Sequence, residues 1–406
     1  MGRTRRPRRS RCRPRAWARS VAERRVLAVS RVIDEHRLYL RDRHRVSAYE
    51  RALGEVIAPG AVVVDLASGT GILGLLACRA GARRVYAIEQ EGIVGPARQI
   101  AEANGYGKRI TAIRGEARHV TIPELADVVV TDQIGGFGLE VGIFDLFKDA
   151  RTRFLRDGGT LVPNAVDLIM APAELGRIHR RTQFWNSRPA GFDFSSAREI
   201  AENTGYQVRM TPGNLLATPA CAARVDFSRD HVLPIRLSAS MRAERAGVLH
   251  GIAGWFDARL SPGVTMTNSP LSNERIFRRP AFFPIGEAVE VVAGSPIDVT
   301  MSVLPADLLY TWDVEVTSRD GSTRRFRHST LRGMLLARED LTRTRPSHRP
   351  TLTPAGEARL TVLRLCDGGR ELAEIERLVY EQHPSLFKNA SEAAMFVAEV
   401  VTRYSS

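Results

Sequence analysis

The chain has 406 residues, of which 44% are hydrophobic, and it carries a formal net charge of +14. Its length suffices for two or three globular domains, and no apolar run approaches the ~20 residues that a membrane-spanning helix needs. The four cysteines lie far apart without a CxxC pair, which argues against a zinc site or a disulfide framework and for a reducing, cytoplasmic location.

Residues 1–25 form an arginine-rich tail, with eleven arginines against one acid, Glu23. Such a tail could attract phosphate groups or a membrane surface. The arginines are not accompanied by an apolar pattern that could pack, so we favour a disordered leader or a start codon assigned too far upstream. No apolar core follows the basic residues either, which argues against a secretory signal. We therefore expect neither a nucleic-acid partner nor a membrane partner.

Apolar residues recur with helical spacing from Val26 to Leu53. In the next stretch, Val62–Gly74 (VVVDLASGTGILG), three valines lead into Asp65, the chain turns through Gly69 and Gly71, and an apolar helical run follows. This succession of buried strand, glycine turn and helix predicts the first unit of a doubly wound α/β sheet. Glycine suits the turn because a Cβ there would keep a bound nucleoside away from the backbone.

The following strand, Arg84–Glu89, ends in Glu89, whose carboxylate can accept both hydroxyl groups of a ribose. Gly69, Gly71 and Gly74 also spell GxGxxG, the pattern of dinucleotide sites. Asp65 indicates another cofactor, because a carboxylate near the turn repels a pyrophosphate and suits the ammonium of a methionine moiety. The DxxxGxG pattern therefore favours S-adenosylmethionine, and a nicotinamide dinucleotide is the alternative.

Two further strands complete the expected Rossmann-like domain, which spans residues 26–164. Strand Ile110–Arg114 precedes Glu116, which could receive an adenine amino group or be a solvated loop acid. Strand Asp127–Val130 leads into Asp132. Since ligands bind at the carboxyl ends of the strands in such a sheet, we expect Asp132 to face the reactive end of the cofactor.

After Pro163 the pattern changes to the period-two alternation of strands. The clearest stretches are Val248–Leu260, Ile297–Val303 and Trp312–Val316. The pair Asp320-Gly321 supplies a hairpin turn after them. We expect an antiparallel β-barrel or a sandwich over residues 165–336.

Residues 337–352 are charged, contain proline and show no apolar pattern, which predicts a linker. Helical spacing returns over residues 353–406, where Ser391 is the expected N-cap of the last helix. The chain thus reads as a Rossmann-like domain, an antiparallel β domain and a small helical module.

This order of elements resembles the protein arginine N-methyltransferases over about residues 33–320. His36–Arg45 (HRLYLRDRHR) is similar to that family's segment of His followed by Leu-x-Asp-x-x-Arg, and Asp65–Glu89 matches its cofactor unit with Ala67 in place of the first glycine. Phe154–Leu168 (FLRDGGTLVPNAVDL) resembles the passage into its barrel. The resemblance adds His36 and Arg45 to the cofactor candidates. With them, the set expected to bind S-adenosylmethionine is His36, Arg45, Asp65, Gly69, Gly71, Glu89 and Glu116.

In that family two glutamates of one loop hold the acceptor guanidinium. Two carboxylates orient the cation, localise its charge and leave a nitrogen lone pair facing the methyl group. The resemblance places Asp132 at the first position, one methylene shorter, and Glu140 at the second, one residue closer in sequence. Asp132 and Glu140 are therefore the catalytic candidates, and ordinary loop acids are the alternative.

The family's Thr-His-Trp motif aligns with Arg275-Ile276-Phe277, so its histidine is missing. Phe277 would keep an aromatic wall, whereas Arg275 would add a positive charge near a site meant for a cation. This departure puts arginine as the acceptor in question.

Two further resemblances concern partners. Phe184-Trp185 with GFDFS at 191–195 is similar to the start of that family's dimerisation arm, here residues 184–214, which implies a homodimer. Within residues 353–406, Leu363-x-x-x-Asp367-Gly368 and Leu372-x-x-Ile375 are similar to PqqD-type winged-helix modules, which bind leader peptides of ribosomally made natural products. That implies a peptide substrate, and a plain helical appendix is the alternative.

The predicted function is S-adenosylmethionine-dependent methyl transfer to a nitrogen acceptor in a protein or peptide. The alternative is a catalytically impaired partner that binds S-adenosylmethionine and recruits peptides.

Overall fold

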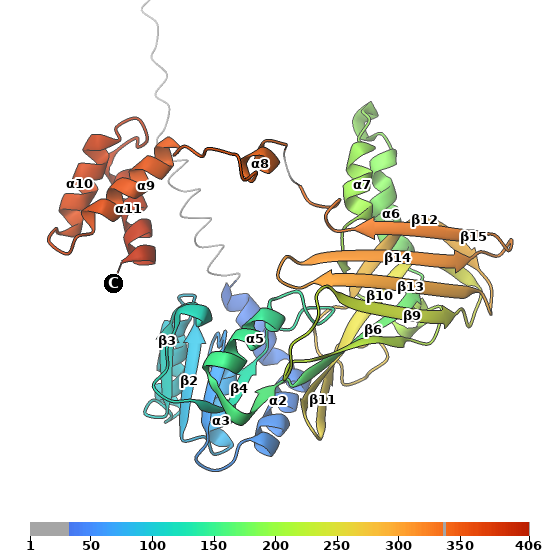
Figure 1. Cartoon of the computed structure of the whole chain (residues 1–406), viewed down its shortest axis with the longest axis horizontal. Helices are drawn as coiled ribbons and strands as arrows, with labels where there is room; N and C mark the ends of the chain where they lie inside the picture. The colour runs from blue at the N-terminus through green and yellow to red at the C-terminus, as the bar shows by residue number, and fades with distance from the viewer. Residues whose placement is uncertain (1–31, 336–337, 406) are drawn as a thin grey trace, which may run out of the picture. The chain divides into compact units, whose positions relative to one another are not determined.

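The computed structural model describes residues 32–335 and 338–405. The chain forms two compact units, which meet in the sequence at Met334 and Leu335 (Figure 1). The predicted arginine-rich tail over residues 1–25 lies outside the described residues.

The described chain begins with helical residues 32–41, followed by α2 (Arg43–Val56). Asp42 separates them and is the N-cap of α2, since its side chain accepts a hydrogen bond from the Arg45 amide. The predicted helical stretch is thus broken at Asp42, whose second carboxylate oxygen accepts the amide of Phe277.

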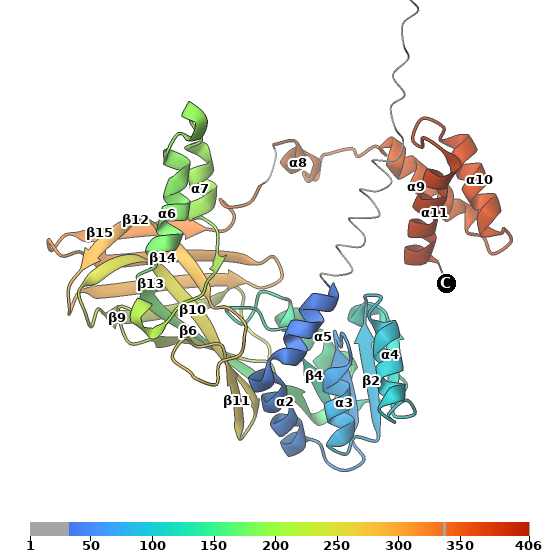
Figure 2. The ribbon, with the colours of Figure 1, turned by 180° about the vertical axis from the view of Figure 1, so that it is seen from behind.

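A parallel sheet with the strand order β3-β2-β1-β4-β5 confirms the predicted Rossmann-like domain. Its strands are β1 (Val62–Leu66), β2 (Arg84–Glu89), β3 (Ile110–Arg114), β4 (Ala126–Thr131) and β5 (Leu155–Val162). The flanking helices, visible in Figure 2, are α3 (Ile72–Arg79), α4 (Val94–Ala103) and α5 (Ile143–Arg153). Every residue of β1 is buried, as expected for a valine-rich central strand covered on both faces. The order reverses at β1, so the carboxyl ends of β1 and β4 border the crevice where such sheets bind ligands.

The antiparallel domain consists of two sheets, so of the two expected architectures, a barrel or a sandwich, no closed barrel is found among the described residues. The larger sheet has the order β7-β12-β10-β6-β8, made by Tyr206–Gln207, Ala281–Val291, Gly247–Ser261, Ala165–Ala173 and Ala220–Asp226, with β11 (Val264–Thr267) paired to β10. The smaller has the order β15-β14-β13-β9, made by Thr323–Ser329, Leu309–Thr317, Pro296–Leu304 and Ile235–Arg242. Strands β8 and β9 lie close together without sharing a ladder. Alternating burial along a strand specifies one apolar face and leaves edge pairing open, so sequence periodicity does not separate the two architectures.

Among the contacts between the antiparallel domain and the parallel sheet domain are those of two side chains, Glu55 and Asn268. The carboxylate of Glu55 accepts hydrogen bonds from the Ser261 hydroxyl (2.6 Å) and the Gly263 amide (3.0 Å). The side chain of Asn268, fully buried, donates to the carbonyl of Gly136 at 2.8 Å. These contacts fix the segment after β11 next to the carboxyl ends of the parallel strands.

Helices α6 (Gly176–Gln183) and α7 (Ser196–Glu202) project together from the larger sheet, as Figures 1 and 2 show. They carry the segment that resembles a dimerisation arm, and its Phe184, Phe192 and Phe194 side chains are exposed.

The second unit has its own apolar core, made by three helices. They are α9 (Pro354–Leu365), α10 (Leu372–Gln382) and α11 (Ala390–Tyr404). No strand occurs among residues 338–405, so the β-wing of a winged-helix module is missing from the described part of this unit. The PqqD-like resemblance stays a prediction.

The predicted linker contains a short helix, α8 (Arg338–Arg343). One local expectation for the second unit was wrong. The N-cap of α11 is Asn389 and not Ser391, since the Asn389 side chain accepts the Glu392 amide at 3.0 Å. Asn and Ser are near-equal caps, so cap preference does not decide between positions two residues apart.

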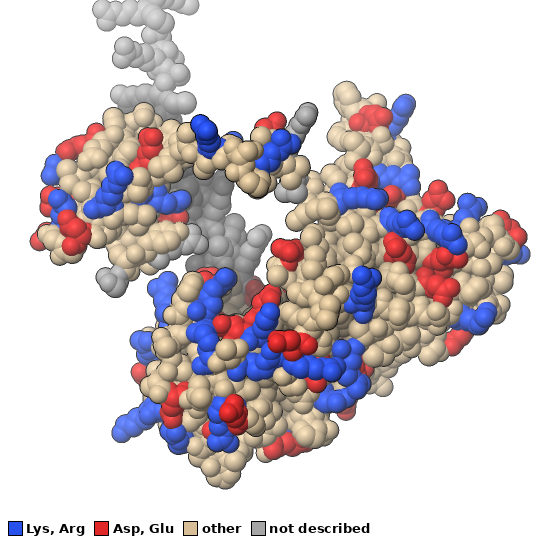
Figure 3. Space-filling view, in the orientation of Figure 1, with Lys and Arg blue, Asp and Glu red and all other residues tan. Residues whose placement is uncertain are grey.

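Charged side chains of both signs are interspersed on the face seen in Figure 3. Several surface arginines of the parallel sheet domain pair with acids, for example Arg156 with Asp127 at 2.7 Å and Arg79 with Glu50 at 2.7 Å. No helix among the described residues is both long and apolar enough to cross a membrane.

Candidate active site

A cavity of about 2030 Å³ opens at the carboxyl ends of the parallel strands. Its walls come from the helical residues 32–41, the turn after β1, the ends of β2 and β4, and the segment 268–280 of the antiparallel domain. Among the predicted site residues, those lining it are His36, Arg45, Gly69, Glu89, Glu116 and Asp132. Asp65, Gly71 and Glu140 do not line it.

The turn after β1 uses left-handed backbone at three positions. Ala67, Gly69 and Gly71 have φ values of 52°, 55° and 80°. A Cβ added at Gly69 would lie 2.6 Å from Cε1 of His36, so only glycine lets that ring approach the turn. Ala67 adopts the left-handed conformation that glycine prefers, which costs conformational energy because alanine has a Cβ.

Glu89 lies at the floor of the cavity and is buried. Its Oε2 accepts the Gly69 amide at 2.9 Å and its Oε1 accepts the Glu91 amide at 2.8 Å. Both bonds fix the carboxylate, and each oxygen keeps a second lone pair for a ligand hydroxyl. Glu116, at the rim, is partly exposed and pairs with Arg118 and, at 3.5 Å, with His119.

Asp65 lies beneath the turn and is fully buried. Its Oδ2 accepts the Gly74 amide at 2.9 Å, while Oδ1 has no hydrogen-bond partner in the described structure. Burial raises the pKa of Asp65 to about 7. Through its bond to the Gly74 amide, this side chain links the end of β1 to the first turn of α3. Its contact with a cofactor ammonium stays a prediction.

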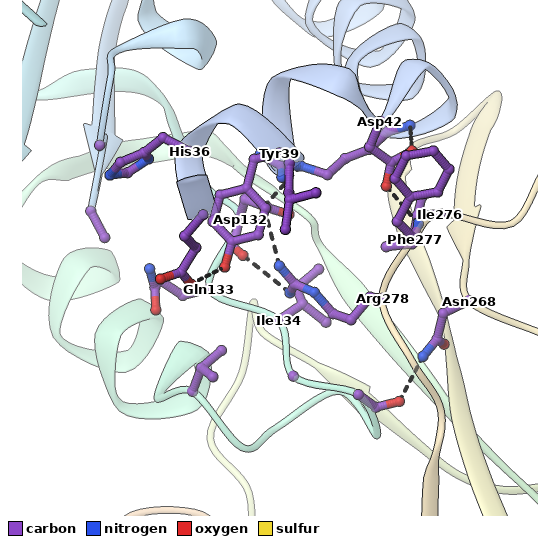
Figure 4. A pocket seen from close by; sticks show the side chains of 18 of the residues that line it. His36, Tyr39, Asp42, Asp132, Gln133, Ile134, Asn268, Ile276, Phe277 and Arg278 are labelled. Atoms are coloured by element: carbon purple, nitrogen blue, oxygen red, sulfur yellow. Dashed lines mark hydrogen bonds and ion pairs between the residues drawn. The ribbon is translucent and has the colours of Figure 1, made fainter. Parts of the chain in front are cut away.

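Asp132 faces the cavity from the end of β4 and is surrounded by donors (Figure 4). Its Oδ2 lies 2.9 Å from Nε of Arg45 and 3.5 Å from Nη2 of Arg278. Its Oδ1 lies 3.2 Å from the hydroxyl oxygen of Tyr49, whose single proton is shared between this carboxylate and the Thr131 carbonyl at 2.9 Å. Burial, reinforced by the charge of Asp132, raises the pKa of Tyr49 well above its ordinary value, so the phenol stays protonated and donates.

Glu140 is turned into its own loop. Its Oε1 accepts the Phe137 amide at 2.6 Å and its Oε2 accepts the Leu139 amide at 3.0 Å. Burial raises the pKa of Glu140, with these amides and the charge of Arg278 opposing the shift. The loop folds closely on this carboxylate. A Cβ at position 135 would clash with Oε2 of Glu140, so the close approach requires the glycine. The two predicted acids are thus not an open pair facing the cavity.

The segment aligned with Thr-His-Trp differs from expectation. Arg275 is exposed and its Nη1 donates to the Pro270 carbonyl at 3.1 Å, so it is not the cation that faces Asp132. Phe277 is 63% exposed and lines the cavity, and its amide donates to Oδ2 of Asp42 at 2.6 Å. The expected aromatic wall at Phe277 stays a prediction.

Sequence reasoning missed four residues of the site: Tyr39, Asp42, Tyr49 and Arg278. Asp42 was visible as the aspartate of the Leu-x-Asp-x-x-Arg segment. The others carried no signal in their spacing, since Arg278 meets Asp132 across 146 positions of the chain.

Some buried polar atoms of residues that line the cavity have no hydrogen-bond partner within the described residues. Nη1 of Arg45 and Oγ of Ser68 are buried and make no hydrogen bond within the described residues, and both side chains line the cavity. Buried polar groups are normally satisfied, so these atoms call for polar ligand groups. A cationic donor, a fixed acid at Glu89 and the close approach allowed by Gly69 fit the carboxylate and the nucleoside of S-adenosylmethionine. No cluster of acids, histidines or cysteines that could hold a metal ion is found in the described part of the chain.

Comparison with known proteins finds similar sequences and a matching family. Residues 165–318 match the family described as arginine methyltransferase oligomerization subdomain. The chain is 28% identical over 282 residues to protein arginine N-methyltransferase 1 of Dictyostelium discoideum, covering 67% of this chain and 82% of the relative. It is 26% identical over 288 residues to protein arginine N-methyltransferase 6 of Xenopus laevis, covering 67% and 84%.

Solved structures share the fold. One is the Trypanosoma brucei PRMT1 enzyme-prozyme heterotetrameric complex with AdoHcy, with a TM-score of 0.65, 20% identity, and coverage of 72% of this chain and 97% of that one. Another is Arabidopsis thaliana protein arginine methyltransferase 10, with a TM-score of 0.63, 21% identity, and coverage of 73% and 97%. The site and these matches together identify the chain as a protein arginine N-methyltransferase-like, S-adenosylmethionine-dependent methyltransferase.

Proposed function

We propose that the protein transfers a methyl group from S-adenosylmethionine to a nitrogen acceptor in a peptide or protein. The observation that carries this proposal is the position of Asp132, which lies between the cofactor half of the cavity, at Arg45, and the segment 268–280 of the antiparallel domain. A carboxylate at that place can orient the hydrogen-bearing nitrogen of an acceptor.

The cofactor half of the site has a residue for each part of the ligand. Glu89 would receive the ribose hydroxyls, Gly69 would let the nucleoside approach the backbone, and Glu116 would receive the adenine amino group. The free Nη1 of Arg45 would bind the amino-acid carboxylate, a charge-assisted contact. When bound, S-adenosylmethionine supplies a methyl group made electrophilic by its sulfonium.

The acceptor half depends on positioning more than on bond chemistry. Tyr49 and Arg45 hold the carboxylate of Asp132 in one orientation, so little reorganisation is needed when an acceptor binds. A water molecule would take up the proton that the acceptor nitrogen loses, because Glu140 does not line the cavity and both of its oxygens accept backbone amides of its own loop. The test is mass spectrometry of a peptide library incubated with the protein and S-adenosylmethionine. Methylated product on a nitrogen supports the proposal, and binding of S-adenosylhomocysteine without any product contradicts it.

One observation favours a second candidate, a cofactor-binding partner without turnover. All four carboxylate oxygens of Asp132 and Glu140 already accept donors from the chain itself. The Trypanosoma brucei neighbour of similar fold is itself an enzyme-prozyme complex. Transfer of a labelled methyl group from the cofactor to any acceptor by the isolated protein would exclude this candidate.

We also propose a homodimer that uses the arm formed by α6 and α7. Support comes from the match of residues 165–318 to an oligomerization subdomain and from the exposed aromatic rings of Phe184, Phe192 and Phe194. Light scattering should report a dimer, and Phe192→Ser with Phe194→Ser should shift it toward monomer. A monomeric wild-type protein at all working concentrations contradicts this proposal.

The helical unit over residues 353–406 is proposed to recruit a peptide, as its resemblance to PqqD-type modules implies. A substrate made ribosomally for natural-product biosynthesis would then be the natural partner. The independent core of this unit supports a separate role, since its helices pack on one another.

A further inference from the structure

The guanidinium of Arg278 lies inside the acceptor half of the cavity (Figure 4). Its Nη1 is 3.4 Å from the carbonyl oxygen of Asp132 and its Nη2 is 3.5 Å from Oδ2 of the same residue. The side chain is only 15% exposed. A cation of this chain thus stands against the carboxylate that would hold a cationic acceptor.

The remaining surroundings of Arg278 match those a bound guanidinium would seek. Its Cζ lies 5.8 Å from the ring centroid of Tyr39, a cation–π distance. Burial, the largest single effect, lowers its pKa, but the charge of Asp132 together with smaller contributions from Tyr39, Tyr49 and Glu140 outweighs burial, so the net pKa is raised and the side chain stays charged. The charges of both predicted catalytic acids, Asp132 and Glu140, therefore act on Arg278.

An incoming guanidinium would meet two obstacles at this place. It would stand beside a like charge that water screens poorly, because Arg278 is mostly buried. It would also find the oxygens of Asp132 in contact with Arg45 and Tyr49, and those of Glu140 in contact with backbone amides. A guanidinium also has to lose a proton during the transfer, and its pKa of about 12 or more makes that loss difficult at neutral pH.

We infer that Arg278 is a specificity-determining residue, which excludes a guanidinium and admits an acceptor nitrogen that is uncharged at neutral pH, such as the imidazole of a histidine side chain. The inference rests on the proposed methyl transfer and specifies its acceptor. An uncharged nitrogen meets no like-charge repulsion and already has a free lone pair, so no strong base is needed before it reacts.

The atoms of such a transfer balance. The lone pair of the acceptor nitrogen forms the nitrogen–carbon bond while the carbon–sulfur bond to the methyl group breaks, and the electron pair of that bond remains on sulfur. The methylated imidazole then carries one positive charge and loses the proton of its other nitrogen to water.

The test uses the full-length protein saturated with S-adenosylhomocysteine for binding, and with S-adenosylmethionine for turnover. Two peptides of one sequence carry either a single histidine or a single arginine. Calorimetry gives the affinity for each peptide, and mass spectrometry gives the methyl transferred. Wild type should prefer the histidine peptide, and Arg278→Met should shift the preference toward the arginine peptide by ~100-fold, as expected for removing a like charge in a poorly screened site.

Two matched variants separate charge from other effects. Arg278→Lys keeps a positive charge and should retain the wild-type preference. Arg275→Met removes a neighbouring arginine, which is exposed and bonded to the Pro270 carbonyl, and should also leave the preference unchanged. Arg278→Gln serves as a second neutral variant if thermal melting shows that the Met variant does not fold.

Two outcomes would overturn the inference: wild type binding the arginine peptide as well as the histidine peptide, or neutral variants at position 278 leaving the ratio unchanged. A protein that binds no S-adenosylhomocysteine, or methylates neither peptide nor any library member, contradicts the proposed function instead. In the second of those cases the binding ratio still decides the role of Arg278.

Discussion

Asp132 and Arg45 form a buried ion pair, with Nε of the arginine 2.9 Å from Oδ2 of the aspartate. The side chain of Arg45 is only 6% exposed and that of Asp132 13%. The pair connects the first turn of α2 to the end of β4, so it joins the proposed cofactor and acceptor halves of the cavity. Removing one partner of such a pair leaves an uncompensated charge, which costs about 3–5 kcal/mol. Changes at either residue should therefore be measured for stability as well as for function.

The first prediction concerns cofactor affinity. Glu89→Ala should weaken binding of S-adenosylhomocysteine by about ten- to a hundredfold, because it removes a charge-assisted hydrogen bond worth about 1.5–3 kcal/mol. Gly69→Val should weaken it as strongly, since the new Cβ would enter the position of the His36 ring at a left-handed φ. Glu50→Ala, which removes a surface ion pair with Arg79, is the control. Calorimetry that finds both site variants equal to wild type would refute the assignment of the cofactor site.

Asp132→Asn should retain cofactor binding and lower methyl transfer by at least ~100-fold, because an orienting charge is lost. Its melting temperature should fall, since Arg45 and Arg278 both lose their carboxylate partner. Asp145→Asn is the matched control, because Asp145 borders the same cavity from α5. Glu140→Gln tests the second acid separately: wild-type turnover in that variant would make Glu140 an ordinary loop acid. Unchanged turnover in Asp132→Asn would contradict the acceptor site itself.

Ala67→Gly should stabilise the protein by about 1 kcal/mol. The alanine has φ 52°, a conformation that costs a residue with a Cβ roughly 1–2 kcal/mol, part of which is offset by the greater freedom of glycine in the unfolded chain. Ala97→Gly, inside helix α4, should have the opposite sign, by about 1 kcal/mol. Urea unfolding of both variants measures the difference, and a destabilised Ala67→Gly would show that the turn is not strained at this residue.

Asp65 should make the stability of the protein depend on pH. Burial raises its pKa to about 7 from a model-compound value of 3.8, with the Gly74 amide opposing and the charges of Glu89 and Asp132 reinforcing the shift. The native state then binds this proton more tightly than the unfolded state, so the contribution to stability is present below about pH 4 and is lost as the pH rises to about 7.

Asp65→Asn removes that titration, so the variant should gain stability relative to wild type between pH 5 and 8, by on the order of 2–4 kcal/mol. Thermal melts of both proteins without added cofactor give the comparison. Asp157→Asn, at an exposed position, should show no such trend. A constant difference across this pH range would show that Asp65 titrates as an ordinary acid.

Truncation after Met334 should leave affinity for S-adenosylhomocysteine unchanged, because the two units have separate cores. It should slow methylation of a full-length substrate, found by mass spectrometry, through weaker capture, and spare a short fragment that carries only the acceptor residue. The kinetic readout is a raised KM with an unchanged kcat for the long substrate. Loss of cofactor binding, or equal kinetics on both substrates, would make the second unit structural and exclude peptide recruitment.

The sequence by itself determined the local parts of the cofactor site. The valine run of β1, the glycine turn and the position of Glu89 depend on neighbours within a few residues, and β2 and β3 have the predicted bounds. Hydrophobic periodicity and the backbone freedom of glycine are properties of short segments, so they are readable before folding.

The tertiary structure decided the acceptor half. Arg278, and not Arg275, faces Asp132 across 146 positions, and the amide of Phe277 meets Asp42 across 235. Which arginine of a run enters a site depends on the path that packing imposes on the segment after β11, and alternating residues of an extended segment face opposite ways. The pairings of Arg278 and Phe277 depend on how the antiparallel domain packs on the parallel sheet, which local sequence patterns do not specify. Glu140 bonds its own loop, where the missing Cβ of Gly135 leaves room for its carboxylate.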